Sequence, residues 1–215
     1  MSYSLILFDL DGTLTNSEPG ITGCAALALK KMGFPVPPQE TLRKFIGPPL
    51  WSSFVNYCGL TEEQAEQAVL LYRETYNVTG AFQNAPYPGI PELLEELKQK
   101  KISLAVATSK PENIALPVLD YFHLTPYFDF ISAPDENEHS SNKDELIRSA
   151  LNARHVPAEQ AVMVGDTRFD AAGAREAGTQ FIGVLYGFGT QEEMEHEGAS
   201  VFAKDIPTLK ALLLQ

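Results

Sequence analysis

Four aspartates fall in two short segments whose residue types and spacing suit the binding of a phosphate group. Asp9 and Asp11 lie two residues apart directly after an apolar run, and Asp166 and Asp170 follow a second apolar run. On an extended backbone, residues two apart point to the same side. Carboxylates that gather at one place repel one another unless a cation lies among them. Oxygen ligands favour a hard ion, and Mg²⁺ is the usual one where phosphate is bound.

The first pair alone has a second interpretation. Asp11 and Gly12 form an Asp-Gly dipeptide, which is a strong signal for the turn of a β-hairpin. The second pair favours the cation site, because Gly165-Asp166-Thr167, followed by Asp170, also comes just after an apolar run and would lie at the same edge of a parallel sheet.

Two further positions supply what a phosphoryl group needs. Thr108 and Ser109 end a third apolar run and offer hydroxyl and backbone N–H groups before a helix expected near Pro111, whose N-terminal dipole favours an anion. Lys143 would bring a positive charge to the same edge. The simpler interpretations are a helix cap for Thr108 and Ser109, and a solvated surface charge for Lys143. Agreement among the four segments favours the phosphate site.

The strands that must position these residues are short apolar runs, which are typical of strands buried on both faces of a sheet. The runs are 5–8, 104–107 and 161–164, with further candidates at 130–133 and 180–185. Helical patterns lie between them, as at 90–100, and Pro117 predicts a kink or a late start in another helix. The alternation predicts an α/β fold with a parallel sheet.

Residues 17–85 break this alternation and predict an all-helical insertion. Helices are expected at 21–32, 40–46, 50–57 and from Thr61, where Gln64 completes a capping box. Turn residues at 86–89 mark the return to the sheet. We therefore predict a Rossmann-like core of residues 1–16 and 86–215, and a helical cap of residues 17–85.

Composition restricts the partners and the compartment. A formal charge of −12 repels nucleic acid and anionic membrane surfaces. The apolar start at 5–8 is too short for a signal peptide and lacks a cleavage site, so we expect none, and no apolar stretch approaches the roughly 20 residues of a membrane span. Cys24 and Cys58 lack metal-ligand spacing and are expected to be free thiols. We expect a cytoplasmic protein that binds a small-molecule phosphate ester, with no nucleic acid and no membrane. The sequence indicates no protein partner.

Taken in order, the four segments resemble the motifs of the haloacid dehalogenase superfamily, specifically its phosphatase branch with a helical cap. The counterparts are Asp9-Leu10-Asp11-Gly12-Thr13, then Thr108, then Lys143, then Gly165-Asp166 with Asp170. The resemblance spans essentially the whole chain and implies that Asp9 is the nucleophile and Asp11 the general acid and base. It also implies Mg²⁺ bound by the Asp9 carboxylate, the Asp11 backbone carbonyl and Asp166, with Asp170 orienting these ligands.

Substrate contacts are expected from both predicted domains. In the core we assign them to Gly12, Ser109 and Lys110. In the cap, the segment that begins at Arg43 resembles phosphoglycolate phosphatase-like and bacterial 5′-nucleotidase-like members, as do residues 186–189. Arg43 is therefore the expected cap residue, although a helix end and an ordinary loop would explain these segments equally well. Phosphoglycolate and nucleoside 5′-monophosphates are both candidate substrates.

Several alternatives share part of this pattern. A phosphomutase shares every core residue. A haloacid dehalogenase needs neither Mg²⁺ nor a residue like Asp11, and a phosphonate hydrolase needs a cap lysine for a Schiff base, for which Lys44 is the candidate. A non-catalytic phosphate-binding regulatory module would not need both Asp9 and Asp11.

Two features depart from the family pattern. Asn16 stands where this branch often has aspartate, and the loop 135–139 is more acidic than a phosphate pocket would suggest, so it is expected to point toward solvent.

Overall fold

The computed structural model describes residues 3–135 and 142–214, and the chain divides into two compact units. One unit is Met1–Asn16 together with Pro86–Gln215, and the other is Ser17–Ala85. Within the described residues, no helix is long and apolar enough to cross a membrane.

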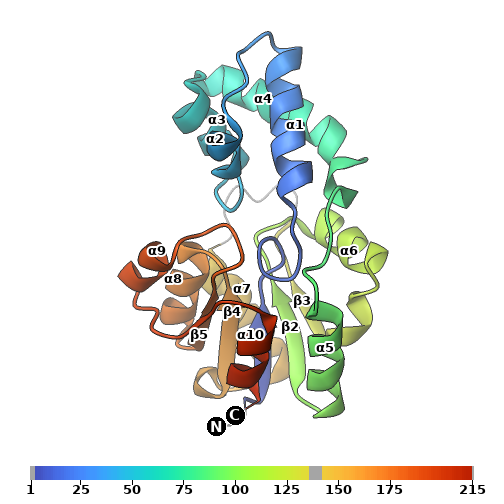
Figure 1. Cartoon of the computed structure of the whole chain (residues 1–215), viewed down its shortest axis with the longest axis vertical. Helices are drawn as coiled ribbons and strands as arrows, with labels where there is room; N and C mark the ends of the chain where they lie inside the picture. The colour runs from blue at the N-terminus through green and yellow to red at the C-terminus, as the bar shows by residue number, and fades with distance from the viewer. Residues whose placement is uncertain (1–2, 136–141, 215) are drawn as a thin grey trace. The chain divides into compact units, whose positions relative to one another are not determined.

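A parallel sheet of six described strands forms the centre of the first unit (Figure 1). In sheet order the strands are β3 (Phe130–Ser132), β2 (Ser103–Ala107), β1 (Leu5–Phe8), β4 (Ala161–Gly165), β5 (Gln180–Val184) and β6 (Phe202–Ala203). This is the order of doubly wound α/β folds, in which ligands bind at the carboxyl edge where the order reverses. Here that point lies between β1 and β4. The predicted Rossmann-like α/β core is confirmed, although β6 had no sequence prediction.

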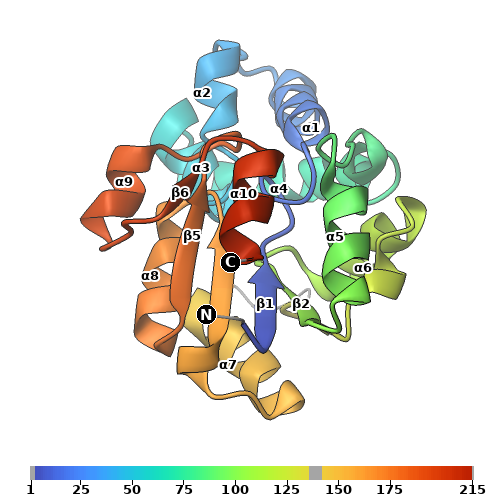
Figure 2. The ribbon, with the colours of Figure 1, turned by 60° about the horizontal axis from the view of Figure 1, so that its bottom comes forward.

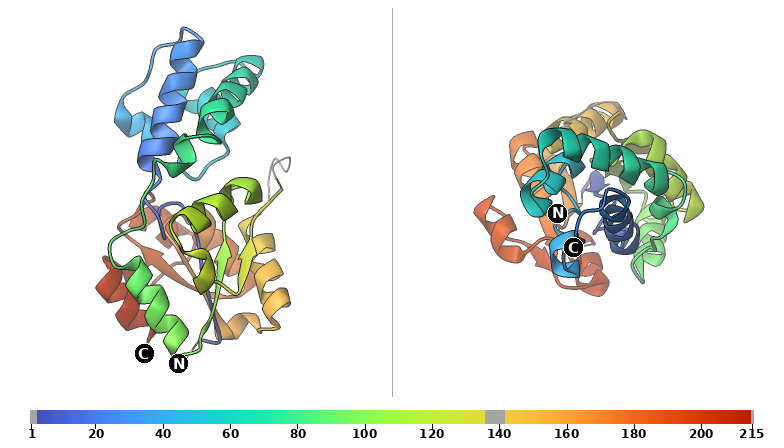
Figure 3. Two further views of the ribbon diagram at one scale, coloured as in Figure 1. Left: turned by 90° about the vertical axis from the view of Figure 1, so that its right-hand side faces the viewer. Right: turned by 90° about the horizontal axis from the view of Figure 1, so that it is seen from above.

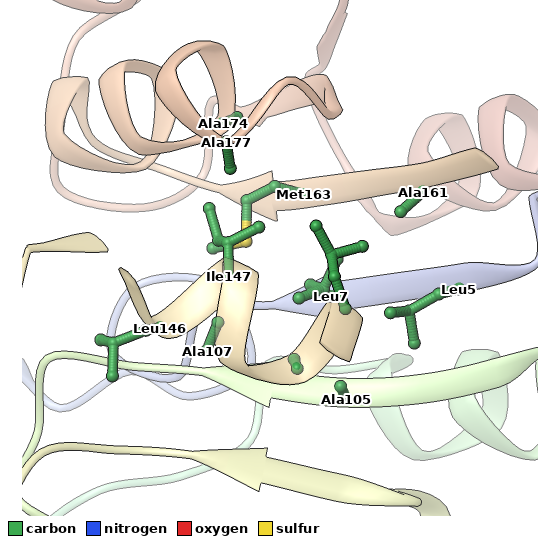
Figure 4. Close-up of a cluster of buried hydrophobic side chains, with 12 residues drawn as sticks. Leu5, Leu7, Ala105, Ala107, Leu146, Ile147, Ala161, Met163, Ala174 and Ala177 are labelled. Atoms are coloured by element: carbon green, nitrogen blue, oxygen red, sulfur yellow. The ribbon is translucent and has the colours of Figure 1, made fainter. Parts of the chain in front are cut away.

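Helices cover both faces of this sheet. On one face, α7 (Lys143–Arg154) and α8 (Arg168–Ala177) bury a cluster of aliphatic side chains from β1, β2 and β4 (Figure 4). On the other face lie α5 (Ile90–Gln99) and α10 (Ile206–Leu213) (Figure 2). All four residues of β1 are buried, because alternate side chains meet helices on opposite faces. The central strand therefore has an uninterrupted apolar sequence.

The remaining elements of this unit are helical. They are α6 (Glu112–Tyr121), α9 (Gln191–His196) and the short 3₁₀ turns η2 (Thr125–Tyr127) and η3 (Ala158–Gln160). Helix α6 begins at Glu112, as predicted near Pro111, and continues through Pro117, so of the two alternatives predicted at Pro117, a kink or a late start, the late start is wrong. Pro117 has no N–H for the carbonyl four residues earlier. Four buried apolar residues on the same helix hold it against the core despite that loss.

The second unit is helical throughout its regular elements (Figure 3). They are α1 (Glu18–Lys31), α2 (Gln39–Arg43), α3 (Leu50–Cys58), α4 (Glu62–Tyr76) and the 3₁₀ turn η1 (Gly80–Phe82). The predicted capping box is confirmed: the Gln64 N–H donates to Thr61 Oγ1 at 3.3 Å, and the Thr61 N–H donates to Gln64 Oε1 at 3.0 Å. The first helix begins three residues before the predicted Ile21, because Pro19 suits the first turn of a helix.

Candidate active site

The carboxyl ends of β1, β2 and β4 bring the predicted site residues to one edge of the sheet. Phe8 pairs in register with Val106 of β2 and Val164 of β4. Asp9, which follows Phe8, donates its backbone N–H to the Val164 carbonyl at 2.9 Å. Asp166 follows β4 directly, and Thr108 follows β2. This arrangement rejects the hairpin interpretation, since both described partners of β1 are parallel to it.

Lys143 is the first residue of α7 and reaches two of these carboxylates. Its Nζ lies 2.8 Å from Asp9 Oδ1 and 2.9 Å from Asp170 Oδ1, and it also donates to the Ala107 carbonyl at 3.1 Å. Only 6% of the lysine side chain is exposed. Burial opposes the charged form, but the two carboxylates outweigh it and raise the pKa of Lys143. Lys143 is therefore a buried ion-pair partner rather than a solvated surface charge.

Asp9, Asp166 and Asp170 form a group of buried carboxylates whose oxygens lie within 4.8 Å of one another. Burial raises the pKa of Asp9 to about 7, with Lys143 opposing the shift and Asp170 adding to it. Burial also raises the pKa of Asp166 well above its ordinary value, and the charges of Asp170 and Asp9 raise it further. Both raised pKa values indicate that nearby positive groups do not fully balance the negative charge of these carboxylates.

The oxygens of this group suit a hard divalent cation. Each oxygen of Asp166 accepts one hydrogen bond, Oδ1 from the Thr13 hydroxyl at 3.2 Å and Oδ2 from the Phe188 N–H at 2.7 Å, which leaves lone pairs on both. Asp170 is engaged differently: Thr167 donates its N–H and its hydroxyl to Oδ2, while Oδ1 is ion-paired with Lys143 at 2.9 Å. Asp166 is therefore suited to direct ligation, and Asp170 to orienting its neighbours.

Asp11 forms an ion pair with a second buried lysine, Lys110. Lys110 Nζ lies 2.7 Å from Asp11 Oδ2, and only 5% of the Lys110 side chain is exposed. Asp11 Oδ1 is buried with no hydrogen-bond partner among the described residues. Within the described part of the chain, the site holds four carboxylates and two ammonium groups, so a divalent cation would balance their formal charge.

Three predicted site residues are neighbours of Asp11 and Lys110 in the sequence but differ in their surroundings: Gly12, Thr108 and Ser109. Thr108 is buried, and its Oγ1 accepts the Lys110 N–H at 3.1 Å, so it shapes the turn after β2 rather than capping α6. Ser109 is exposed. Gly12 has φ of +91° and approaches Asp166 so closely that a Cβ there would lie 2.2 Å from Asp166 Oδ2.

Arg43 belongs to the helical unit, where its Nε donates to Glu18 Oε1 at 2.7 Å. Gln39 donates to the same oxygen at 3.0 Å, and 60% of the arginine side chain remains exposed. Lys44 lies over the Tyr57 ring, 5.9 Å from its centroid. The predicted substrate role of Arg43 stays a prediction. Most of the acidic loop 135–139, expected to point toward solvent, lies outside the described residues.

The sequence did not predict two hydrogen bonds that the segment after β5 makes with the candidate site. Phe188 contacts Asp166 through its backbone N–H, and the Tyr186 hydroxyl donates to the Thr13 carbonyl at 3.1 Å. The paired glycines at 187 and 189 were the available signal, because alternate glycines often mark the close approach of two backbones.

Comparison with known proteins places this geometry in a family. The family model described as Haloacid dehalogenase-like hydrolase matches residues 6–184, most of the chain. The chain belongs to the haloacid dehalogenase-like hydrolases. Among relatives, a 5′-nucleotidase of Pseudomonas aeruginosa is 39% identical over 213 residues, covering 99% of this chain and 96% of that protein.

Two further proteins similar to this hydrolase are named as phosphatases. A phosphoglycolate phosphatase of Pseudomonas savastanoi pv. phaseolicola is 29% identical over 212 residues, covering 95% of this chain and 78% of that protein. The crystal structure of a predicted phosphatase from Clostridium acetobutylicum matches with a TM-score of 0.92 and 38% identity, covering 100% of this chain and 99% of that one. The family, the fold and these relatives together support a phosphatase. The predicted family resemblance is confirmed.

Proposed function

We propose that this haloacid dehalogenase-like phosphatase hydrolyses a small phosphorylated metabolite through an aspartyl-phosphate on Asp9. The observation that carries the proposal is the position of Asp9. Its carboxylate is buried at the sheet edge, 2.8 Å from Lys143 and within the oxygen group that contains Asp166. A carboxylate held this way is a fixed nucleophile beside a fixed positive charge.

Metal binding is part of the proposal. Asp9 and Asp166 would hold Mg²⁺ together with the Asp11 backbone carbonyl, while Asp170 fixes Lys143 and the loop after β4. When bound, Mg²⁺ would act as a Lewis acid that neutralises charge on the phosphoryl oxygens. Support comes from the excess of carboxylates over lysines and from the raised pKa values of Asp9 and Asp166.

The protein's own groups perform the remaining steps. Phosphate dianion repels an anionic nucleophile, so Lys143 and the Thr108 hydroxyl would neutralise the phosphoryl oxygens while Asp9 attacks phosphorus in line. The bond from phosphorus to the leaving oxygen breaks as the bond to Asp9 forms. Asp11 would protonate the leaving alcohol and then take a proton from the water that attacks the phosphoenzyme. Lys110 would hold Asp11 in position for both transfers, since it contacts Asp11 Oδ2 at 2.7 Å.

The names of the relatives and the charge of the chain support a proposal for the substrate class. Phosphoglycolate and nucleoside 5′-monophosphates are the leading candidates, because relatives named for each activity match nearly the whole chain. A protein with a formal charge of −12 has no general affinity for long polyanions, which favours a small ester. We propose Arg43, Ser109, Lys110 and Gly12 as the residues that contact it.

A substrate screen tests this proposal. Purified protein with Mg²⁺ is given a panel of phosphometabolites that includes both candidates, and inorganic phosphate release is measured. We expect release from at least one small phosphomonoester. Conversion of a sugar phosphate to its isomer without phosphate release would favour a phosphomutase, and no reaction with any member would favour a phosphate-binding regulatory module.

Asp11→Asn should separate the two halves of the reaction. Asn cannot donate or accept the proton that Asp11 transfers, but its amide oxygen can still accept from Lys110. The substitution leaves the nucleophile Asp9 unchanged. Steady-state turnover of a metabolite should fall by about 10²- to 10⁴-fold, the usual range for loss of a general acid or base. An aryl phosphate needs little protonation of its leaving group. Rapid mixing should therefore show a burst of phenol roughly stoichiometric with enzyme, followed by slow phosphate release. Equal phenol and phosphate rates without a burst would contradict the role of Asp11 in dephosphorylation.

Arg43→Ala should affect metabolites much more than a featureless aryl phosphate, because we propose that Arg43 binds the part of the substrate remote from phosphorus. We expect kcat/KM to fall about 10-fold or more for the metabolite and less than about 2-fold for the aryl phosphate. Lys31→Ala is the matched control, since Lys31 forms another exposed ion pair in the same unit, with Glu74 at 3.3 Å. Equal losses on both substrates would assign Arg43 a structural role.

A further inference from the structure

The segment Tyr186–Gly189, which follows β5, contacts both loops that carry the predicted metal ligands. Its Phe188 N–H donates to Asp166 Oδ2 at 2.7 Å, and its Tyr186 hydroxyl donates to the Thr13 carbonyl at 3.1 Å. Thr13 in turn donates its hydroxyl to Asp166 Oδ1 at 3.2 Å. The two oxygens of Asp166 are thus held by donors from two loops, and Tyr186 fixes one of those loops.

Glycine is needed for this arrangement. A Cβ on Gly187 would lie 2.4 Å from Asp166 Oδ2 and 2.5 Å from the Gly12 carbonyl oxygen. A Cβ on Gly189 would lie 2.2 Å from the Asp166 carbonyl oxygen. These distances are far shorter than real side-chain contacts, so the backbones of the three segments pack directly against each other. The segment therefore has little freedom to shift without moving Asp166.

Packing fixes the Tyr186 ring as well as its hydroxyl. The ring meets Tyr87 edge to face, with centroids 4.8 Å apart and planes at 62°. Tyr87 donates its backbone N–H to the Leu14 carbonyl at 3.0 Å, which anchors the residue after Thr13. Burial raises the pKa of Tyr186, with smaller contributions from Asp166 and Tyr87, so the hydroxyl keeps its proton at neutral pH. Tyr186 is thus a rigid donor at the turn that carries Asp9 and Asp11.

We propose that Tyr186 is a positioning residue, which acts through Thr13 to hold the Asp166 carboxylate in the orientation that binds the divalent cation. Groups that hydrogen-bond around a metal ligand fix its orientation, and their removal typically weakens metal binding by about 10- to 100-fold. This inference rests on the proposed Mg²⁺ site. It concerns the binding of the metal and not the chemical step itself.

Tyr186→Phe tests the inference, because it removes only the hydroxyl and keeps the ring against Tyr87. Mg²⁺ binding is measured by calorimetry without substrate, and Mg²⁺ dependence of aryl phosphate hydrolysis is measured in parallel. We expect Kd for Mg²⁺ to rise about 10-fold, near the low end of the range for groups around a metal ligand, because Tyr186 acts on Asp166 through Thr13 and not directly. At saturating Mg²⁺, kcat should return to within about 2-fold of wild type, because the reacting groups are unchanged.

Tyr127→Phe is the matched control, since Tyr127 lies in η2 of the same unit. It should change neither Kd nor kcat. Thermal unfolding with and without Mg²⁺ distinguishes a structural role: a lower Tm in Tyr186→Phe with an unchanged Kd would overturn the inference. A fall in kcat that Mg²⁺ does not rescue would overturn it too. If wild type itself does not bind Mg²⁺, the proposed metal site fails, whereas equal affinities in wild type and Tyr186→Phe contradict only the role of Tyr186.

Gly187→Ala gives a second, independent test of the same contact. The added Cβ would lie against Asp166, so the carboxylate or the segment has to move. We expect the folded variant to bind Mg²⁺ more weakly than Tyr186→Phe does. Folding is checked by circular dichroism, and Gly23→Ala serves as the control, because a Cβ on Gly23 would meet only the Gln83 side chain, at an ordinary contact distance of 3.9 Å. Wild-type Mg²⁺ affinity in folded Gly187→Ala would contradict the proposed coupling.

Discussion

Asp9→Asn is expected to eliminate turnover, with kcat falling by on the order of 10⁴- to 10⁶-fold, as is typical for loss of a catalytic nucleophile. An amide is a poor nucleophile, so the phosphoenzyme does not form. The substitution keeps the size of the side chain and an oxygen that can accept from Lys143, which lies 2.8 Å from Asp9 Oδ1 in wild type. The measurement is phosphate release from the best substrate of the panel, together with acid-quenched labelling by ³²P-substrate.

Labelling separates this prediction from a loss of folding. Wild type and Asp11→Asn should both carry acid-stable label after quenching, and peptide mapping should place it on Asp9. Asp9→Asn should carry none while keeping an unfolding transition near that of wild type, because the repulsion relieved among the crowded carboxylates offsets the loss of the ion pair with Lys143. Label on another residue, or a phenol burst in Asp9→Asn, would show that Asp9 is not the nucleophile.

The sheet edge was predictable because its strands leave a strong pattern. Strands buried on both faces are uninterrupted apolar runs, and Asp9, Thr108 and Asp166 each follow one of them directly. Parallel strands end at a common edge, so the meeting of these residues follows from topology alone. Lys143 was harder to place, since a lysine at the start of a helix is usually solvated. Only the structure shows its two ion pairs with Asp9 and Asp170.

Other contacts leave no local signal. Lys110 and Asp11 are 99 residues apart, and a single lysine after a strand does not reveal which carboxylate it meets. The Tyr186 hydroxyl reaches a backbone carbonyl, and a carbonyl is present at every residue, so residue types do not identify the partner. β6 has only two residues, too few for a periodic pattern to be recognised. Predictions from residue type thus identified the charged groups, and geometry was needed to pair them.

Removal of divalent metal is expected to lower turnover by at least about 10³-fold, which corresponds to the several kcal/mol that a bound cation contributes to a phosphoryl-transfer site. The physical reason is charge. Asp9, Asp166 and Asp170 place their oxygens within 4.8 Å of one another, and an incoming phosphate dianion would add to the repulsion. Lys143 and Lys110 offset only part of this charge. Protein treated with chelator and then desalted should regain full activity when Mg²⁺ is added.

A stability measurement tests the same site without turnover. Mg²⁺ that binds the folded protein and not the unfolded chain raises Tm, with about 2.7 kcal/mol of added stability at 100 times Kd. Asp166→Asn should reduce this shift, because an amide supplies no negative charge to the ion. Glu159→Gln, in the 3₁₀ turn η3, is the matched control and should show the wild-type shift. Full activity after exhaustive metal removal, with no Tm response to Mg²⁺, would contradict the phosphatase mechanism and favour a dehalogenase, which attacks carbon with a carboxylate and needs no metal.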